Sequence, residues 1–431
     1  MKNSDLISRS LRSVWHPCTQ MKHHETLPLI PFSRGSGIWL YDFEENRYLD
    51  AISSWWVNLF GHCNRKINSA ISDQLGKLEH AILAGCTHEP VVALSERLSM
   101  LSGLDHAFYA SDGASAVEIA LKMSFHFWKN RGMPQKKKFV SIENGYHGET
   151  LGALSVTDVA IFKDNYSPLV MEGIKAKTPD WRHAEEGESP HEFALRASLG
   201  LEKILEENHE NIAALIIEPL IQGAAGMGMH DPVYLSRARQ LCDRYGVHLI
   251  ADEIAVGFGR TGTFFAFEQA SIVPDFLCLS KGITGGYLPL SAVLSRSAIY
   301  DAFYEDSIAR AFLHSHSYTG NALACRAALA VLDIFEDEDV IERNREKSAI
   351  MSKKAEILAT HPKVRHFRNS GMIWAFEVID PSTDFPRRFH LDALNHGLLL
   401  RPIGNTVYFM PPYVIEEEEM DLLVNGTSAC L

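Results

Sequence analysis

The chain has 431 residues, of which 46% are hydrophobic and 22% charged, and its formal net charge is −13. These values are typical of a soluble globular protein, and the length predicts more than one domain. The acidic balance argues against nucleic acid or an acidic membrane surface as the main partner. No apolar run has the length of a signal peptide or a membrane span, so we expect a cytoplasmic protein. Seven scattered cysteines without metal-ligand spacing indicate reduced thiols.

The first predicted elements are two short strands, residues 37–42 and 48–51, whose pattern indicates a β-hairpin. From about residue 67 to residue 335, apolar strands alternate with helical stretches, which is the pattern of a doubly wound, mostly parallel sheet. The polar stretch 175–192 has no hydrophobic period and predicts a surface excursion within this region. Two later segments predict antiparallel strands: residues 364–378 and 407–410.

This order of elements predicts an α/β protein with two domains. The large domain, residues 67–335, carries the mostly parallel sheet. Because antiparallel strands are expected at both ends of the chain, residues 1–66 and 336–431 are predicted to form one smaller α+β domain together.

A candidate phosphate site follows the predicted strand at residues 106–110, which runs through a turn into an amphipathic helix. Glycine lets the backbone approach an anion, and the free amides of a helix start are donors with a partial positive charge. Gly113, Ala114 and Ser115 are the candidate ligands. An ordinary capped connection between strand and helix is the alternative.

Two further predicted strands end in candidate functional side chains. The strand at 138–142 is followed by Tyr146, whose ring could stack on a planar cofactor, although a tyrosine in a loop often only packs. The strand at 213–217 is followed directly by Glu218.

The most informative pair is Lys281 and Asp252, because each ends an apolar run that predicts a buried parallel strand. An open α/β sheet binds its ligands at such strand ends. A lysine and a carboxylate there suggest pyridoxal phosphate (PLP): the lysine can bind its aldehyde covalently, and the aspartate can keep its ring nitrogen protonated. A buried ion pair is the structural alternative. Since five strand ends carry such groups, one shared site explains them better than coincidence.

Two other patterns are weaker. The glycines of residues 257–262 match the spacing of the dinucleotide fingerprint, but acidic residues end the strand before them and no apolar helix follows, so a nicotinamide dehydrogenase is not favoured. The histidine pairs at 23–24 and 314–316 have no third or fourth ligand at zinc spacing, so we expect no metal site.

Together these motifs resemble the class III (omega-type) aminotransferases, which have PLP fold type I. The resemblance spans roughly residues 12–424, and it is carried by residues 144–148, 217–219, 251–254, 257–262, 280–282 and 318–321. It implies a PLP enzyme that is a symmetric homodimer with two shared active sites.

The resemblance also implies roles for the candidate residues. Lys281 would bind PLP and then serve as the base that moves the substrate proton, and Asp252 would keep the ring nitrogen protonated. Tyr146 would stack on the ring, and Glu218 would orient the network beside it. Ser317 would reach the phosphate bound in the partner subunit.

Local signatures narrow the resemblance to family members that transfer an amino group from S-adenosylmethionine to 8-amino-7-oxononanoate in biotin biosynthesis. They lie at residues 15–17, 53–56 and 401–413. Arg401 would bind the acceptor carboxylate, since its planar guanidinium suits a carboxylate bidentately. Trp55, Tyr408 and His316 would contribute to the substrate pocket.

The chain departs from the family pattern at three places. An aromatic residue often follows Trp-His-Pro, and here it is Cys18; Ala114 and Ser115 replace a commoner Gly-Ser pair; and residues 315–317 replace Gly-Pro-Thr. The alternatives left open are lysine as the amino donor, another omega-aminotransferase reaction, and a PLP aminomutase, which shares the fold and the lysine but needs no separate donor.

Overall fold

The computed structural model describes residues 2–379 and 382–431. The chain divides into two compact units, one made of Met1–Asn68 with Arg345–Leu431 and the other of Ser69–Asn344. The functional domain boundaries expected at 66/67 and 335/336 stay a prediction. Within the described residues, no helix is both long enough and apolar enough to cross a membrane.

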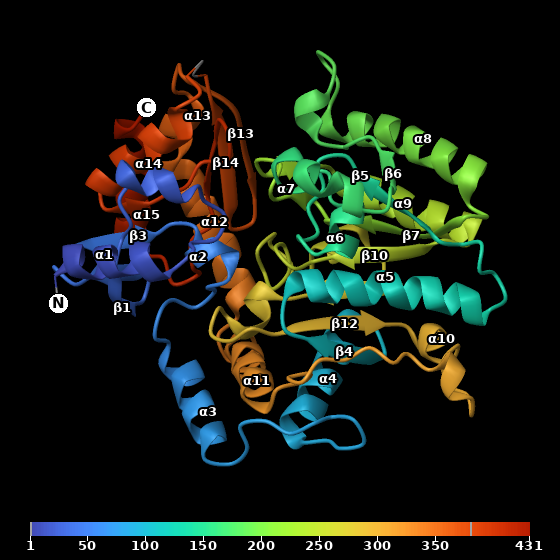
Figure 1. Cartoon of the computed structure of the whole chain (residues 1–431). Coiled ribbons are helices and arrows are strands. Elements are labelled where there is room, and N and C mark those ends of the chain that lie inside the picture. The colour runs from blue at the N-terminus through green and yellow to red at the C-terminus, as the bar shows by residue number, and fades with distance from the viewer. Residues whose placement is uncertain (1, 380–381) are drawn as a thin grey trace. The chain divides into compact units, whose positions relative to one another are not determined.

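The unit Ser69–Asn344 is built on a seven-stranded sheet (Figure 1). Across the sheet the strands are β4 (His106–Ala110), β12 (Ser291–Ser295), β11 (Phe276–Leu279), β10 (His248–Asp252), β7 (Ile212–Ile217), β5 (Lys138–Ile142) and β6 (Ile174–Ala176). Of these seven, β12 alone runs antiparallel to both of its neighbours, and the other adjacent pairs are parallel. The predicted mostly parallel α/β sheet is confirmed.

The central strands are buried along their whole length because helices cover both faces of a sheet of this kind. Every residue of β7, β10 and β11 is buried. Helix α5 (Gly113–Asn130) packs on the sheet with a face that includes Val117, Ala120 and Trp128. This packed core holds the strand ends at fixed positions.

The other helices of this unit connect the strands. The α-helices are α4 (Glu89–Ser102), α6 (Leu151–Val156), α7 (Ala160–Lys163), α8 (Pro190–Asn208), α9 (Pro232–Tyr245), α10 (Ser297–Tyr300) and α11 (Ala322–Asp337). The 3₁₀-helices are η2 (Asp164–Leu169), η3 (Trp181–His183), η4 (Ala266–Ala270), η5 (Lys281–Thr284) and η6 (Ile308–Arg310). A two-stranded sheet pairs β8 (Ile221–Gln222) with β9 (Gly228–Met229).

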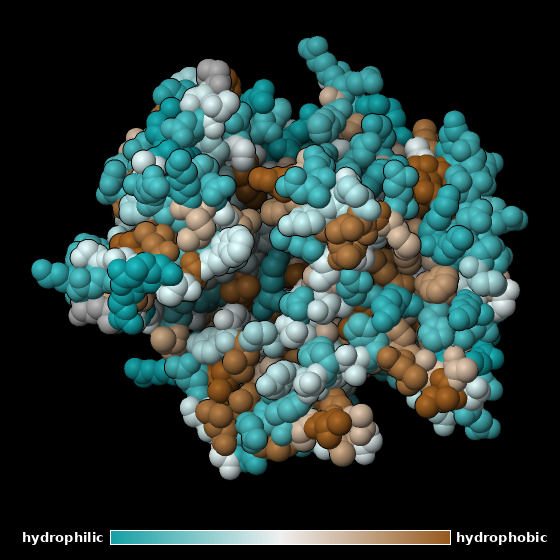
Figure 2. All heavy atoms as spheres, in the orientation of Figure 1, coloured by the Kyte–Doolittle hydropathy of each residue, from teal (hydrophilic) through white to brown (hydrophobic). Residues whose placement is uncertain are grey.

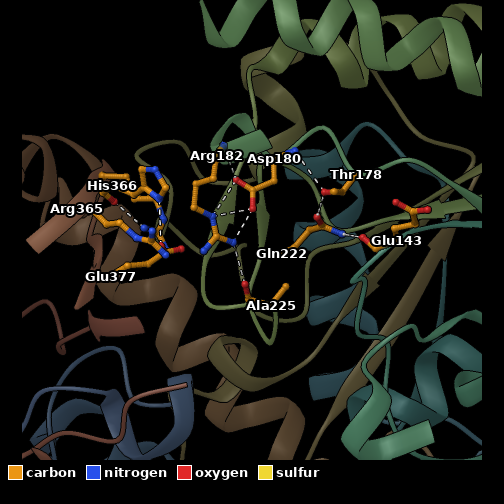
Figure 3. Close-up of polar contacts among 10 residues, drawn as sticks. Glu143, Thr178, Asp180, Arg182, Gln222, Ala225, Arg365, His366 and Glu377 are labelled. Atoms are coloured by element: carbon orange, nitrogen blue, oxygen red, sulfur yellow. Dashed lines mark hydrogen bonds and ion pairs between the residues drawn. The ribbon is translucent and has the colours of Figure 1, made fainter. Parts of the chain in front are cut away.

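The prediction of a surface excursion at 175–192 is wrong for its first part. Thr178 and Asp180 are buried, and they belong to the polar network drawn in Figure 3. Thr178 Oγ1 donates to Gln222 Oε1 over 2.5 Å, and the Arg182 guanidinium holds Asp180 and the carbonyl of Ala225. The hydrophobic pattern of the sequence does not reveal that this segment is buried, because its buried side chains are polar and form hydrogen bonds within the network.

The unit Met1–Asn68 with Arg345–Leu431 contains two further sheets. The first has the order β1 (Phe32–Ser36), β2 (Trp39–Asp42), β3 (Arg47–Asp50) and β15 (Leu398–Leu399). The second has the order β13 (Val364–Ser370), β14 (Ile373–Val378) and β16 (Thr406–Phe409). The predicted hairpin, now β2 and β3, is confirmed. Segments from the two chain ends also meet in this unit, because β15 pairs with β3, in parallel.

The helices of this unit are α1 (Asn3–Ser13), η1 (Met21–Glu25), α2 (Ser53–Trp56), α13 (Glu356–Ala359), α14 (Phe385–Asn395) and α15 (Glu417–Ala429). Two more, α3 (Arg65–Leu75) and α12 (Val340–Lys354), contain the division between the units.

Candidate active site

Four adjacent strands deliver the predicted catalytic residues to one edge of the large sheet. Lys281 follows β11, Asp252 ends β10, Glu218 follows β7 and Tyr146 lies in the loop after β5. These strands are parallel, and the register places Ala251 opposite Ile217, so the groups that follow them emerge at the same level. The structure therefore brings these four residues together.

Asp252 is a buried carboxylate with two donors. His147 Nδ1 lies 2.7 Å from Asp252 Oδ2, and the backbone N–H of Ile254 donates to Oδ1 over 3.1 Å. His147 is itself buried, its backbone N–H donates to Thr157, and its Nε2 has no hydrogen-bond partner among the described residues. Sequence reasoning missed His147, whose only signal was its place beside Tyr146 after a strand.

Lys281 turns sharply out of its strand. Its φ is 48°, a left-handed value that L-residues adopt only at a cost, and it is partly buried. Desolvation lowers the pKa of Lys281 to about 8, against the opposite pull of Asp252 and Glu218. The neutral amine, which covalent or base chemistry requires, is thus much more populated near neutral pH than in a free lysine.

Glu218 connects two loops beneath this edge. Its carboxylate accepts the backbone N–H of Tyr146 over 2.9 Å and that of Gly223 over 3.0 Å. These donors favour the ionised form, but burial outweighs them and raises the pKa of Glu218 to about 7. Glu218 is therefore poised between its two protonation states near neutral pH.

The Tyr146 ring is half-buried beside Phe162, with ring centroids 5.3 Å apart, and its hydroxyl donates to Glu149 over 2.9 Å. The start of the loop that carries Tyr146 is held by a hydrogen bond, in which Gln222 Nε2 donates to the carbonyl of Glu143 over 2.8 Å. That bond joins the loop to the network of Figure 3. Stacking of Tyr146 on a cofactor stays a prediction.

The candidate phosphate site is the start of α5. The first amides of an α-helix have no partner within it, and Gly113 and Ala114 supply two of them. A Cβ at Gly113 would lie 3.0 Å from Ile254, the residue whose amide binds Asp252, so the helix start and Asp252 are close neighbours. The amide and hydroxyl of Ser115 both donate to the capping carboxylate of Asp112, so phosphate binding by Ser115 would require it to exchange partners.

The dinucleotide pattern at residues 257–262 serves another purpose. This segment leads to the 3₁₀-helix η4 and not to an α-helix. The buried Glu253 accepts the amides of Ala266 and Phe267, each over 2.7 Å, and burial raises its pKa to about 8. Of the glycines in this pattern, Gly257 lies against Glu253 and donates its N–H to the Glu253 carbonyl over 3.0 Å.

Ser317 and His316 lie in the loop before α11. Ser317 is exposed, and its carbonyl oxygen lies 2.7 Å from His80 Nε2. His316 Nδ1 accepts the backbone N–H of Tyr318 over 3.1 Å, so its Nε2 carries the proton when the ring is neutral. Their contacts to phosphate and substrate stay predictions.

The predicted substrate residues Trp55, Arg401 and Tyr408 belong to the other unit, where the structure brings them together. The Arg401 guanidinium carbon lies 5.6 Å from the centroid of the Trp55 ring. Trp56, the next residue, donates from Nε1 to the Tyr408 hydroxyl over 3.1 Å. Burial raises the pKa of Tyr408 to about 12, with a smaller opposing effect of Arg401, so this phenol stays protonated.

Helix α2, which presents Trp55, is a left-handed turn. All four of its residues have positive φ, between 47° and 74°, and none is glycine. Such a conformation costs L-residues about 1–2 kcal/mol each. Asp50 offsets this cost: it is fully buried, and its carboxylate accepts the Ser54 amide over 2.8 Å and the Ser54 hydroxyl over 2.7 Å. Sequence reasoning could not find this turn, because no glycine marks it.

Cys18, the residue that departs from the family pattern, is exposed and also has a positive φ, 53°. The neighbouring Trp15 is exposed as well. No described group of three or more His, Cys, Asp or Glu residues is arranged to hold a metal.

Comparisons with known proteins agree with this geometry. The family model Aminotransferase class-III matches residues 20–431. The chain is 48% identical to adenosylmethionine-8-amino-7-oxononanoate aminotransferase of Helicobacter pylori, over 98% of this chain and 96% of that protein. It is 41% identical to the protein of that name from Geobacter sulfurreducens, over 96% and 94% of the two chains.

Solved structures give the same result. The structure of adenosylmethionine-8-amino-7-oxononanoate aminotransferase from Methanocaldococcus jannaschii matches with a TM-score of 0.92 and 35% identity, covering 100% of this chain and 99% of that one. A PLP-bound amine transaminase from an uncultivated Pseudomonas species matches with a TM-score of 0.91 and 32% identity, covering 97% and 98%.

Proposed function

The chain belongs to the class III aminotransferases, and we propose that it transfers an amino group from S-adenosylmethionine to 8-amino-7-oxononanoate, giving 7,8-diaminononanoate for biotin biosynthesis. The observation that carries the proposal is the meeting of Lys281, Asp252, Glu218 and Tyr146 on four adjacent strands of a chain with these relatives. The substrate pair is that of the relatives' names, and the Trp55–Arg401 pair suits a carboxylate acceptor.

PLP is the cofactor that these residues fit. The amides of Gly113 and Ala114 suit its phosphate, the buried Asp252 suits its ring nitrogen, and the lysine with a lowered pKa suits its aldehyde. When bound, PLP withdraws electrons from the substrate carbon and carries the amino group between the two half-reactions.

The protein's own groups divide the remaining work. Lys281 Nζ, whose pKa burial lowers to about 8, takes the proton from the carbon that bears the amino group and returns one later. Asp252, held by His147 and the Ile254 amide, presents a fixed negative charge to the ring nitrogen. Glu218 holds the Tyr146 backbone, and the ring of Tyr146 would then cover the bound cofactor and exclude water.

The acceptor is bound through its carboxylate. Arg401 is exposed, and its guanidinium offers a planar fork of donors to that group. The Trp55 ring covers one side of the guanidinium, and Tyr408 and His316 are further candidates for contact with the substrate.

We further propose a cytoplasmic homodimer in which Ser317 serves the active site of the other subunit. The large apolar side chains of Ile82, Leu313 and Tyr318 are exposed near Ser317, which favours their burial by a second copy. Apolar groups are also exposed among polar ones on the face shown in Figure 2. The cysteines Cys242, Cys278 and Cys325 are buried free thiols, as is usual in a reducing compartment.

The test separates the two half-reactions. The PLP form, mixed with S-adenosylmethionine alone, should convert to the pyridoxamine form, and the isolated pyridoxamine form should then convert 8-amino-7-oxononanoate to the diamine, identified by mass. An aminomutase would instead turn over a single substrate without a donor. Failure of the second step with a competent first step would show a different acceptor.

A further inference from the structure

The left-handed turn α2 is fixed at three of its four residues. Ser53 Oγ donates to the carbonyl of Met410 over 2.7 Å, Ser54 is held by Asp50, and Trp56 Nε1 donates to Tyr408. Trp55 lies between these anchored residues, is 47% exposed and faces Arg401. The anchors therefore determine where the Trp55 ring lies.

Among these anchors, the carboxylate of Asp50 has the largest part. It binds both the backbone and the side chain of Ser54, and His62 Nε2 lies 3.0 Å from Oδ2, where only a donor can sit. Asp50 ends β3, whose parallel neighbour β15 leads directly to Arg401, since Leu399 lies opposite Asp50. The same strand pair thus supports both the turn and the arginine.

We propose that Asp50 is a positioning residue of the acceptor site: by holding Ser54 it keeps the turn left-handed and so keeps Trp55 over Arg401. This inference rests on the proposed function, in which Arg401 binds the acceptor carboxylate. Asp50 itself, fully buried, touches neither substrate nor cofactor in this role.

The proposal predicts a specific rescue. In Asp50→Asn, an NH₂ group replaces one of the two carboxylate oxygens, so only one acceptor atom remains. If the NH₂ group takes the place of Oδ2, it faces the donors Ser54 Oγ and His62 Nε2, and both hydrogen bonds are lost. Glycine adopts positive φ without the cost that serine has. The change Ser54→Gly should therefore remove much of the need for Asp50, provided that Asp50 acts through the backbone.

The experiment compares the wild type with Asp50→Asn, Ser54→Gly, the double variant and Asp421→Asn. Asp421 is an exposed partner of Lys354 in the same unit and undergoes the same chemical change. The readouts are the KM and kcat for 8-amino-7-oxononanoate, the rate of the half-reaction with S-adenosylmethionine, and the midpoint of thermal unfolding.

We expect Asp50→Asn to raise the acceptor KM by about tenfold or more while the donor half-reaction stays within about twofold. The double variant should recover most of the lost acceptor affinity. Asp50→Asn should also lower the midpoint of thermal unfolding less in the Ser54→Gly background than in the wild type. Ser54→Gly alone and Asp421→Asn should resemble the wild type.

Three results would overturn the proposal: a normal acceptor KM in Asp50→Asn, equal damage to both half-reactions, or no rescue by Ser54→Gly. If Asp50→Asn does not fold, Ser54→Ala, which loses only the hydroxyl contact, should still raise the acceptor KM selectively. A wild type that ignores 8-amino-7-oxononanoate would instead contradict the proposed function. The unfolding comparison needs no substrate, and it would still decide whether Asp50 holds the turn.

Discussion

His147 Nδ1 and Asp252 Oδ2 lie 2.7 Å apart, and both side chains are buried. A carboxylate only accepts, so the histidine donates from Nδ1 and fixes the orientation of Asp252. The histidine thereby leaves Nε2 directed away from the pair, buried and without a partner among the described residues. The pair thus holds the Asp252 carboxyl group in a fixed geometry, which suits a ligand whose ring nitrogen is protonated.

Asp252→Asn should therefore retain PLP but lose most of its turnover, because a neutral amide does not keep the ring nitrogen protonated. Absorbance of the bound cofactor measures how much PLP is retained, and steady-state kinetics measure the loss of turnover. Asp243→Asn is the control, since Asp243 is an exposed partner of Arg239 in the same unit. Near-normal turnover in Asp252→Asn would contradict the assigned role.

Lys281→Ala should lose covalent cofactor attachment and at least about 10²-fold in turnover, the usual contribution of a positioned base. Borohydride reduction and peptide mapping of the wild type should place the pyridoxyl group on Lys281. Lys175 is the natural competitor, because burial also lowers its pKa to about 8. A label on Lys175 would show that a low pKa, and not the place beside Asp252, decides attachment.

The stability of the cofactor-free protein should fall as the pH rises from about 4.5 to about 7, in proportion to the titration of Glu218. Its pKa is raised to about 7 in the fold, so between these values the folded state binds more protons than the unfolded state. The shift corresponds to roughly 3 kcal/mol. Urea unfolding should show a smaller pH dependence in Glu218→Gln over this window, and an unchanged slope would refute the assignment.

Arg401→Ala should weaken use of the acceptor by about 2–5 kcal/mol, the range for removing one partner of a desolvated charge pair. The half-reaction with the donor should change far less. Arg365→Ala, which removes an exposed arginine paired with Glu377 in the same unit, is the matched control. Equal loss in both half-reactions would assign Arg401 to the fold or to the donor.

S-adenosylmethionine, and not lysine, should convert the PLP form to the pyridoxamine form in a single turnover. Trp55 offers a ring for the adenine or the sulfonium. Cys18 stands where the family pattern often has an aromatic residue, so lysine must be tested as a donor beside S-adenosylmethionine. Conversion by lysine alone would change the donor and leave the aminotransferase assignment in place.

The candidate residues that the structure brings to one edge of the sheet share one physical origin. Lys281, Asp252 and Glu218 each lie at the end of a mainly apolar run, and such runs become parallel strands whose ends meet. The residues that sequence reasoning missed lack such a signal. His147 differs from any loop histidine only by its contact with Asp252, and the turn at Ser53–Trp56 is left-handed without a glycine to announce it.

The left-handed backbone of Lys281 affects how long a protein with a substitution at this position would survive in a cell. Lys281→Gly would remove both the left-handed strain and a desolvated amine, so the cofactor-free variant should be at least as stable as the cofactor-free wild type. Chaperones and proteases act on unfolded molecules, and they would have no reason to remove it. A cell with this substitution would accumulate a durable, well-folded protein without activity, and only a chemical assay would detect the damage.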